Sequence, residues 1–197
     1  MSKYFDLNTK QKTVNTPKFN EKFESKYLLN HCQKLKNLDK DLTRLPGREE
    51  FFFLQTENSF NAFTFIPWIC QHERIISLYA STYSIGSKVV NALMELHDGG
   101  LIDEITLLIS DSMIKRNPVV IDNLTSVAQS RGNVNVLFSW VHAKVCILET
   151  ENDFYIIEGS GNWSENAQYE QYIFGNSKAV YEFRKELFTN TKIISRA

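Results

Sequence analysis

A histidine and a lysine stand two residues apart in the stretch VHAKVCILE, residues 141–149. The stretch otherwise reads as a buried strand, and side chains alternate between the two faces of a strand. His142 and Lys144 are therefore expected on one face, where they would present two basic groups, while the apolar residues pack on the other. An isolated His-x-Lys pair is more often a strand with a solvated face than a site.

A second polar motif follows in GSGNWSEN, residues 159–166. Gly159 and Gly161 allow a tight bend and a close approach of the backbone to a ligand. Ser160 and Asn162 offer a hydroxyl and an amide at an i, i+2 spacing. Together with the basic pair, they would form a plausible phosphate cradle.

The ordered set of His142-x-Lys144, an acid at residue 149 and Gly159-Ser160-x-Asn162 resembles the H-x-K-x4-D and G-S-x-N signature of the phospholipase D superfamily. This superfamily includes phospholipases, lipid synthases and metal-independent nucleases. The compound match is more specific than any of its parts. It extends in architecture over about residues 74–188.

The resemblance implies a mechanism that needs neither a metal nor a cofactor. His142 would attack the phosphorus of a diester to form a phosphohistidine, and a second histidine would protonate the leaving oxygen. Lys144, Ser160 and Asn162 would hold the nonbridging oxygens. Water would then release the phosphate.

Two departures from the family pattern concern the acid and the hairpin. Glu149 stands where the family usually has Asp, and the nine residues 150–158 make the hairpin longer than usual. Strict alternation places Glu149 opposite His142, so a supporting role is expected rather than proton transfer. Glu170 falls where related single-motif nucleases have a glutamate that holds the imidazole, and Glu165 is its competitor.

The second histidine is not evident in one copy of the chain. His31, His72 and His97 are followed two residues later by Gln, Arg and Gly, so none repeats the His-x-Lys motif. We therefore expect a homodimer, in which a two-fold axis brings His142 of each chain to one shared site.

The remaining sequence predicts an α/β fold, phospholipase D-like, with a mixed, mostly parallel sheet and helices on both faces. Strand and helix patterns alternate from residue 74 to residue 138, as expected for crossover connections. An antiparallel pair over residues 142–149 and 154–159 carries the histidine. Another strand at 169–175 and a helix at 178–188 complete the pattern.

Charge divides the chain into a basic arm, residues 1–46, and a phosphodiesterase domain, residues 47–197. The arm holds ten Lys and Arg against five Asp and Glu, and the remainder holds twelve against eighteen. Apolar residues recur at helical spacing over residues 21–42, which predicts an amphipathic helix ended by Pro46-Gly47. The arm is either a solvated extension or a contact to phosphates.

The cysteines and the N-terminal sequence indicate the cellular compartment in which the protein is expected. The three cysteines are far apart and predict neither a disulfide framework nor a zinc site. The start of the sequence lacks the apolar core of a signal peptide, and no stretch reaches the length of a membrane span. A cytoplasmic setting is therefore expected.

These features favour an endonuclease that acts on DNA or RNA with little sequence preference. One alternative is a nucleic-acid-binding module of the same fold that grips phosphates without cutting. Another is a phospholipid phosphodiesterase, for which FTFIPWIC, residues 63–70, could supply a docking surface but more simply fills the core.

Overall fold

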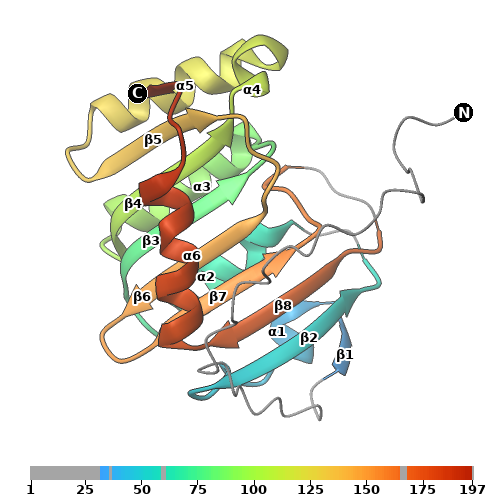
Figure 1. Cartoon of the computed structure of the whole chain (residues 1–197). Coiled ribbons are helices and arrows are strands. Elements are labelled where there is room, and N and C mark those ends of the chain that lie inside the picture. Colours follow the sequence, from blue (N-terminus) through green and yellow to red (C-terminus); the bar gives the residue numbers. More distant parts are fainter. Residues whose placement is uncertain (1–31, 36, 59–60, 165–167, 197) are drawn as a thin grey trace, which may run out of the picture.

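The computed structural model describes residues 32–35, 37–58, 61–164 and 168–196. Within these residues nine strands form one sheet, in the order β1-β2-β8-β7-β6-β3-β4-β5-β9 (Figure 1). The strands are β1 (Cys32–Leu35), β2 (Glu50–Thr56), β3 (Ile75–Thr82), β4 (Ile102–Ser110), β5 (Val134–Ser139), β6 (Val145–Thr150), β7 (Phe154–Gly159), β8 (Gln171–Asn176) and β9 (Ser195–Arg196). The helices are α1 (Leu38–Asp41), α2 (Phe65–Cys70), α3 (Ser87–Asp98), α4 (Ser112–Arg116), α5 (Pro118–Gln129) and α6 (Lys178–Asn190).

The predicted alternation of strands and helices between residues 74 and 138 is confirmed. β3, β4 and β5 pair in parallel, and α3 and α5 lie between them in the chain. Pro118 opens α5, where its missing N–H costs no hydrogen bond. Gly100, just after α3, has a φ of 74°, a left-handed conformation that glycine adopts without a steric penalty.

The expectation of a mostly parallel sheet is wrong. The parallel pairs are β1–β2, β3–β4 and β4–β5, whereas the other five pairs are antiparallel. A parallel pair needs a crossover connection, which α3 and α5 supply. β6, β7 and β8 follow one another without a crossover helix, so they form an antiparallel meander.

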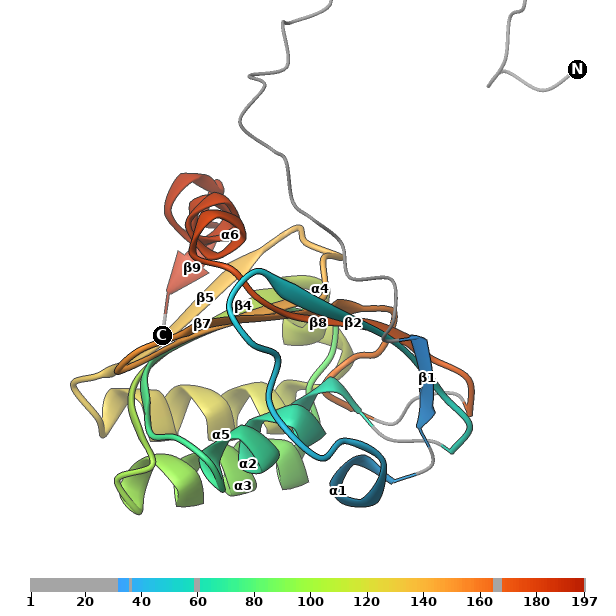
Figure 2. The same ribbon diagram turned by 90° about the horizontal axis from the view of Figure 1, so that it is seen from below.

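Helices cover both faces of the sheet, as expected. Figure 2 shows α1, α2, α3 and α5 against one face and α6 against the other. The larger apolar core lies under the first group and includes Leu93 of α3 and Leu124 of α5, while the smaller core includes Tyr181 and Phe188 of α6. Burying each such side chain stabilises the fold by about 1.5–3 kcal/mol, so both layers are firmly attached to the sheet.

The predicted helix over residues 21–42 lies largely outside the described residues. In its last part, the structure has β1 and the single-turn helix α1, so the helix does not continue through residues 32–35. β1 pairs with β2, and Leu38 and Leu42 are buried in the larger core. These residues therefore pack with the domain, although they precede the expected boundary at residue 46.

The aromatic segment FTFIPWIC is core rather than surface. A 3-10 turn (Ala62–Thr64) runs into α2. Phe63, Phe65 and Trp68 are each less than 10% exposed, at 7%, 0% and 3%. The segment is therefore not available as a docking surface for a lipid.

Candidate functional site

Along one side of the sheet, at the carboxyl ends of the parallel strands, neighbouring strands begin or end. β3, β4, β5 and β7 end there, and β6 and β8, which run antiparallel to their neighbours, begin there (Figure 1). We call this the site edge. In the described residues its connecting segments are 83–86, 111–117, 140–144, 160–164 and 168–170. Ligands of α/β sheets commonly bind outside the carboxyl ends of the strands, so chemistry-bearing residues here are well placed.

His142 and Lys144 lie in the segment that leads into β6. The sequence predicted both on the strand itself, but the strand begins later, at Val145. The alternation nevertheless extends beyond the strand: Val141 packs in the smaller core, whereas His142 is exposed and Lys144 is half-buried. The basic pair therefore occupies the side of the segment that does not pack, as the pattern predicted.

Two hydrogen bonds to backbone carbonyls hold this segment at the site edge. The Ser81 hydroxyl at the end of β3 donates to the Ala143 carbonyl at 3.0 Å. The Gly159 N–H at the end of β7 donates to the Lys144 carbonyl at 3.3 Å. The neighbours on both sides of β6 thus fix the backbone from which the two basic side chains project.

The imidazole of His142 contacts Lys144 and Tyr83. Nζ of Lys144 lies 3.3 Å from Nδ1 of His142 and donates to the His142 carbonyl at 3.1 Å. The centroid of the Tyr83 ring lies 4.8 Å from that of the imidazole. The histidine is therefore held by a cation on one side and an aromatic ring on another.

Ser160 is tied to the start of β8. Its backbone N–H donates to the Gln171 carbonyl at 3.0 Å, and its hydroxyl accepts from the Gln171 N–H at 3.0 Å. The same hydroxyl donates to the carboxylate of Glu170. Ser160 and Glu170 are thus brought together directly.

The structure does not bring Glu170 into contact with His142. Its backbone exchanges hydrogen bonds with Thr56 of β2, through the Thr56 N–H at 2.8 Å and the Thr56 hydroxyl at 2.7 Å. Its carboxylate contacts Ser160 instead of the imidazole. Glu165, the other candidate for holding the imidazole, lies outside the described residues.

Gly159 occupies a position that admits no side chain. A Cβ at this residue would overlap the Gln171 carbonyl and lie 2.6 Å from the Tyr172 ring. The close approach of β7 to the start of β8, which positions Ser160, therefore requires glycine here. The sequence predicted glycine here for a tight bend and a close approach to a ligand; in the structure the close neighbour is the start of β8.

Asn162 is half-buried in a loop that Trp163 anchors. Trp163 is 2% exposed, and its N–H is shared between the Ser84 carbonyl at 3.1 Å and the Thr82 hydroxyl at 3.2 Å. The Trp163 carbonyl in turn accepts from the Gly86 N–H at 3.0 Å. The loop that carries Asn162 is thereby fastened to the segment after β3.

Glu149 lies away from the site edge, toward the other end of β6. Its carboxylate accepts hydrogen bonds from Ser77 at 3.4 Å and Tyr181 at 3.3 Å, on the face covered by α6. Five residues of strand separate it from Lys144, which is about 16 Å. This surrounding suits the supporting role predicted for Glu149.

The charges at the site edge influence one another. Burial lowers the pKa of Lys144, and the nearby Glu170 carboxylate and Tyr83 raise it part of the way back. Hydrogen bonding to Ser112 and the charge of Arg116 lower the pKa of Tyr83. The Arg116 guanidinium lies over the Tyr83 ring, 5.1 Å from its centroid.

Tyr83 and Arg116 were not predicted as site residues. Both follow strands that end at the site edge, Tyr83 after β3 and Arg116 in α4 after β4. The available signal was their position just beyond the ends of two predicted strands of one sheet.

The described histidines other than His142 have different surroundings. His72 follows α2 and packs against Trp68, with ring centroids 5.0 Å apart. Nδ1 of His97, near the end of α3, is 2.9 Å from the Asp98 carboxylate. Neither supplies a second imidazole beside His142 in this chain, and His31 lies outside the described residues.

The described residues contain no group of three or more His, Cys, Asp or Glu side chains arranged to hold a metal ion. They also include no helix that combines the length and the apolar character needed to cross a bilayer.

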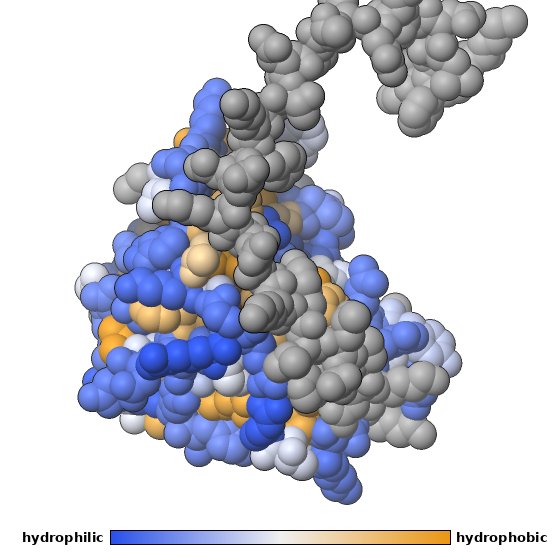
Figure 3. All heavy atoms as spheres, turned by 60° about the horizontal axis from the view of Figure 1, so that its bottom comes forward, coloured by the Kyte–Doolittle hydropathy of each residue, from blue (hydrophilic) through white to orange (hydrophobic). Residues whose placement is uncertain are grey.

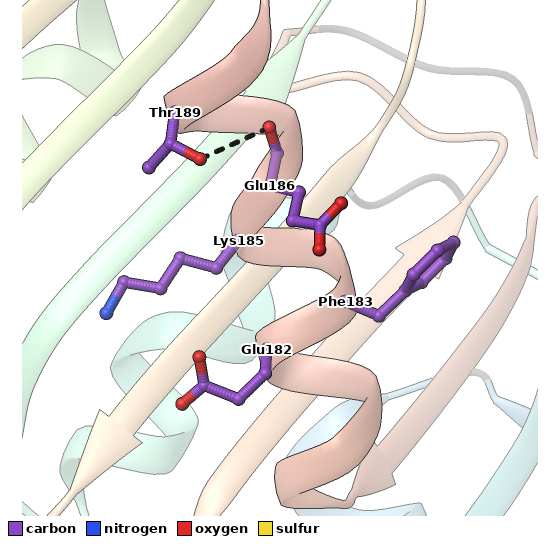
Figure 4. Close-up of a pocket in the computed structure, with 5 residues that line it drawn as sticks. All are labelled: Glu182, Phe183, Lys185, Glu186 and Thr189. Atoms are coloured by element: carbon purple, nitrogen blue, oxygen red, sulfur yellow. Dashed lines mark hydrogen bonds between the residues drawn. The ribbon is translucent and has the colours of Figure 1, made fainter. Parts of the chain in front are cut away.

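A hollow on the outer side of α6 is separate from the site edge. Figure 4 shows that its lining side chains all come from this one helix: Glu182, Phe183, Lys185, Glu186 and Thr189. They carry charges of both signs, and none of the predicted site residues is among them. The site edge is therefore the better candidate.

Comparisons of the whole fold identify similar solved structures. NucT from Helicobacter pylori is similar with a TM-score of 0.52 and 15% identity, over 72% of this chain and 96% of that chain. Polyphosphate kinase from Porphyromonas gingivalis has a TM-score of 0.53 and 11% identity, over 72% and 26%. Phosphatidylserine synthase from Haemophilus influenzae has a TM-score of 0.50 and 11% identity, over 73% and 40%.

These neighbours share a phospholipase D-like fold, and the chain therefore has this fold. No family model matches the sequence. No curated protein matches it either. The similarity shows the fold alone, so a proposal for function depends on the residues at the site edge.

Proposed function

We propose that the protein is a metal-independent phosphodiesterase, most simply an endonuclease that cleaves DNA or RNA through a phosphohistidine at His142. The observation that carries the proposal is the convergence of the two sequence motifs on one sheet edge. His142 and Lys144 enter β6 there, and Ser160 and Asn162 leave β7 beside them. The phospholipase D-like fold of the neighbours adds support, since one of them is named NucT.

The proposed first step transfers the phosphoryl group to His142. A ring nitrogen of the imidazole attacks phosphorus and forms the P–N bond, while the bond from phosphorus to the leaving oxygen breaks. A general acid gives that oxygen its proton. Lys144, Ser160 and Asn162 hold the nonbridging oxygens, whose charge must be stabilised throughout.

The second step releases the phosphate. Water attacks phosphorus and gives up a proton to the group that acted as the acid. The P–N bond breaks, and its electron pair returns to the imidazole. The imidazole of His142 and the general acid are then back in their starting protonation states.

A homodimer is part of this proposal, because the acid needs a source. We propose that His142 of a second copy protonates the leaving oxygen in a site shared across a two-fold axis. The surroundings of His72 and His97 support this, since each has a different partner in this chain. We also propose a cytoplasmic setting, which fits the free thiols of Cys70 and Cys146.

A second candidate function is a phosphate-binding module that does not cut. The contacts of His142 and Glu170 favour it, because the carboxylate contacts Ser160 and the imidazole contacts Lys144. A nucleophilic imidazole usually needs a partner that fixes its tautomer. The expected contact between Glu170 and His142 is not formed here. Catalytic contacts in unliganded sites are often long, so this arrangement is compatible with both functions.

The deciding experiment measures cleavage of a supercoiled plasmid and a labelled single strand in excess EDTA. The variants are His142→Ala and, as a matched control, His72→Ala, which removes an exposed histidine elsewhere. We expect the wild type and His72→Ala to cut and His142→Ala to be inactive. Binding without cutting by the wild type would favour the module, and loss of cutting in EDTA would refute metal independence.

A further inference from the structure

Two large aromatic side chains are exposed beside the proposed site residues. Trp140 is 91% exposed and stands two residues before His142. Tyr169 is 64% exposed and immediately precedes Glu170. Leaving rings of this size in water forgoes the stabilisation that burial would give. Of the described aromatic side chains, only Phe183 on α6 is comparably exposed, at 55%.

The two rings belong to opposite ends of the site edge. Trp140 follows the end of β5, and Tyr169 precedes the start of β8. Between β5 and β8 the sheet order places β4, β3, β6 and β7. Five strand spacings separate the two ends, which is about 24 Å.

Positive charge lies between the two rings. Lys144 and His142 precede β6, and Arg116 lies over Tyr83 beyond the ends of β3 and β4. Lys115, also in α4, is exposed. An anion chain laid along the edge would therefore meet an aromatic ring, several basic groups and a second aromatic ring.

This arrangement fits an unpaired polynucleotide. Aromatic rings bind nucleic acid by stacking on base faces, which is sequence-tolerant because every base has such a face. In a duplex those faces are already occupied by neighbouring bases, whereas a single strand can turn its bases outward. The basic groups would meanwhile follow the phosphates.

We infer that the substrate is single-stranded DNA or RNA, held by stacking of bases on Trp140 and Tyr169 on either side of the scissile phosphate. This inference rests on the proposed function, because it assigns the substrate class of the same site. The face in Figure 3 is mainly hydrophilic, with separate hydrophobic patches where the described residues are visible. The basic groups between the two rings suit phosphates, so we assign the rings to bases rather than to a lipid surface.

Tryptophan fluorescence can report this contact directly. The chain has three tryptophans, and Trp68 and Trp163 are only 3% and 2% exposed. Added oligothymidylate or oligouridylate should quench the emission of Trp140 and protect it from acrylamide. A duplex of equal length should do neither, and equal quenching by the duplex would overturn the inference.

Variants separate the role of the rings from that of the catalytic groups. Trp140→Ala and Tyr169→Ala should each weaken single-strand binding about tenfold in anisotropy titrations and leave duplex binding unchanged. Phe183→Ala removes a ring that is 55% exposed on α6 and serves as the control. Trp140→Phe should retain most of the affinity, because a ring remains. Unchanged single-strand affinity in both alanine variants would overturn the inference.

Two further measurements show whether a negative result contradicts the stacking role or the proposed catalysis. A small diester without a base, such as methyl p-nitrophenyl phosphate, should be hydrolysed equally by the wild type and the control Phe183→Ala. If neither hydrolyses it while Trp140→Ala still loses single-strand binding, the proposed catalysis fails and the stacking role stands. If Trp140→Ala changes only the sedimentation of the protein, a second copy of the chain occupies the ring and the inference is wrong.

Discussion

Nζ of Lys144 lies 3.3 Å from Nδ1 of His142. When the ammonium donates to Nδ1, the proton of a neutral imidazole sits on Nε2, and neither ring nitrogen is then bare. A bound phosphate would compete for the ammonium and release Nδ1. In this contact the lysine therefore occupies one ring nitrogen of the proposed nucleophile.

Phosphate binding should be lost at a lower pH than it would be if Lys144 had the ordinary pKa of a lysine. Burial lowers the pKa of Lys144, so its charge is present below that lowered value and is lost as the pH rises through it. Lys144→Arg should retain binding to higher pH, because guanidinium stays protonated. Calorimetric titration with inorganic phosphate from about pH 7 to about pH 10 measures this. Identical alkaline losses in the wild type and Lys144→Arg would contradict it, and Lys178→Arg is the exposed control.

Removing the charge of Glu170 should shift that alkaline loss to lower pH. The carboxylate raises the pKa of Lys144 and so opposes the effect of burial. Glu170→Gln removes this charge and should therefore lower the pKa of Lys144 further. The same calorimetric titration detects the change without relying on activity. A shift to higher pH would mean that the two side chains are not coupled in this way.

Glu149→Gln should leave the turnover number within about twofold of the wild type. Its carboxylate contacts Ser77 and Tyr181 on the α6 side of the sheet rather than the site edge. Its loss should appear in the free energy of unfolding instead, by about 1 kcal/mol for weakened hydrogen bonds. Steady-state kinetics and urea unfolding measure the two quantities. A large fall in turnover with unchanged stability would assign Glu149 to catalysis.

Gly159→Ala should destabilise the protein by about 1–3 kcal/mol, because the added methyl group overlaps the start of β8. Gly132→Ala is the matched control, since a Cβ there has no described heavy atom within 4 Å. Urea unfolding of both variants gives the comparison. Equal stabilities would show that β8 can move away from residue 159.

Tyr83→Ala should lower turnover about tenfold, because the imidazole loses the ring that helps orient it. Tyr83→Phe keeps the ring contact and should retain most of the activity. The ratio of the two variants in kcat, measured with a labelled oligonucleotide, tests this. If Tyr83→Phe were as inactive as Tyr83→Ala, the hydroxyl rather than the ring would be required.

The sequence predicted most elements that lie between β3 and β5, because each has a strong period and clear ends. Pro118 and the glycines after α3 marked helix boundaries through their own backbone preferences. β1 and β9 were missed, since strands of four and two residues carry almost no pattern of their own. They are defined by their pairing with β2 and β5.

The sequence predicted that the two motifs lie near one another, but it did not predict their side-chain contacts. Side-chain alternation correctly separated His142 and Lys144 from the packed face, even though β6 starts after them. The partner of Glu170 depends on how the start of β8 lies against β7, which local sequence does not specify. Tyr83 and Arg116 reach the site through the order of the strands, a property of the whole sheet.

The short strands at the two margins of the sheet affect how copies of the chain can associate. β1 has four residues and β9 has two, so in the described part of the chain the strands at both margins are short. Long unpaired margins invite one sheet to continue into the next and produce open-ended aggregates. Short strands of this kind give a second copy less backbone to pair with laterally, which is compatible with the closed dimer proposed above.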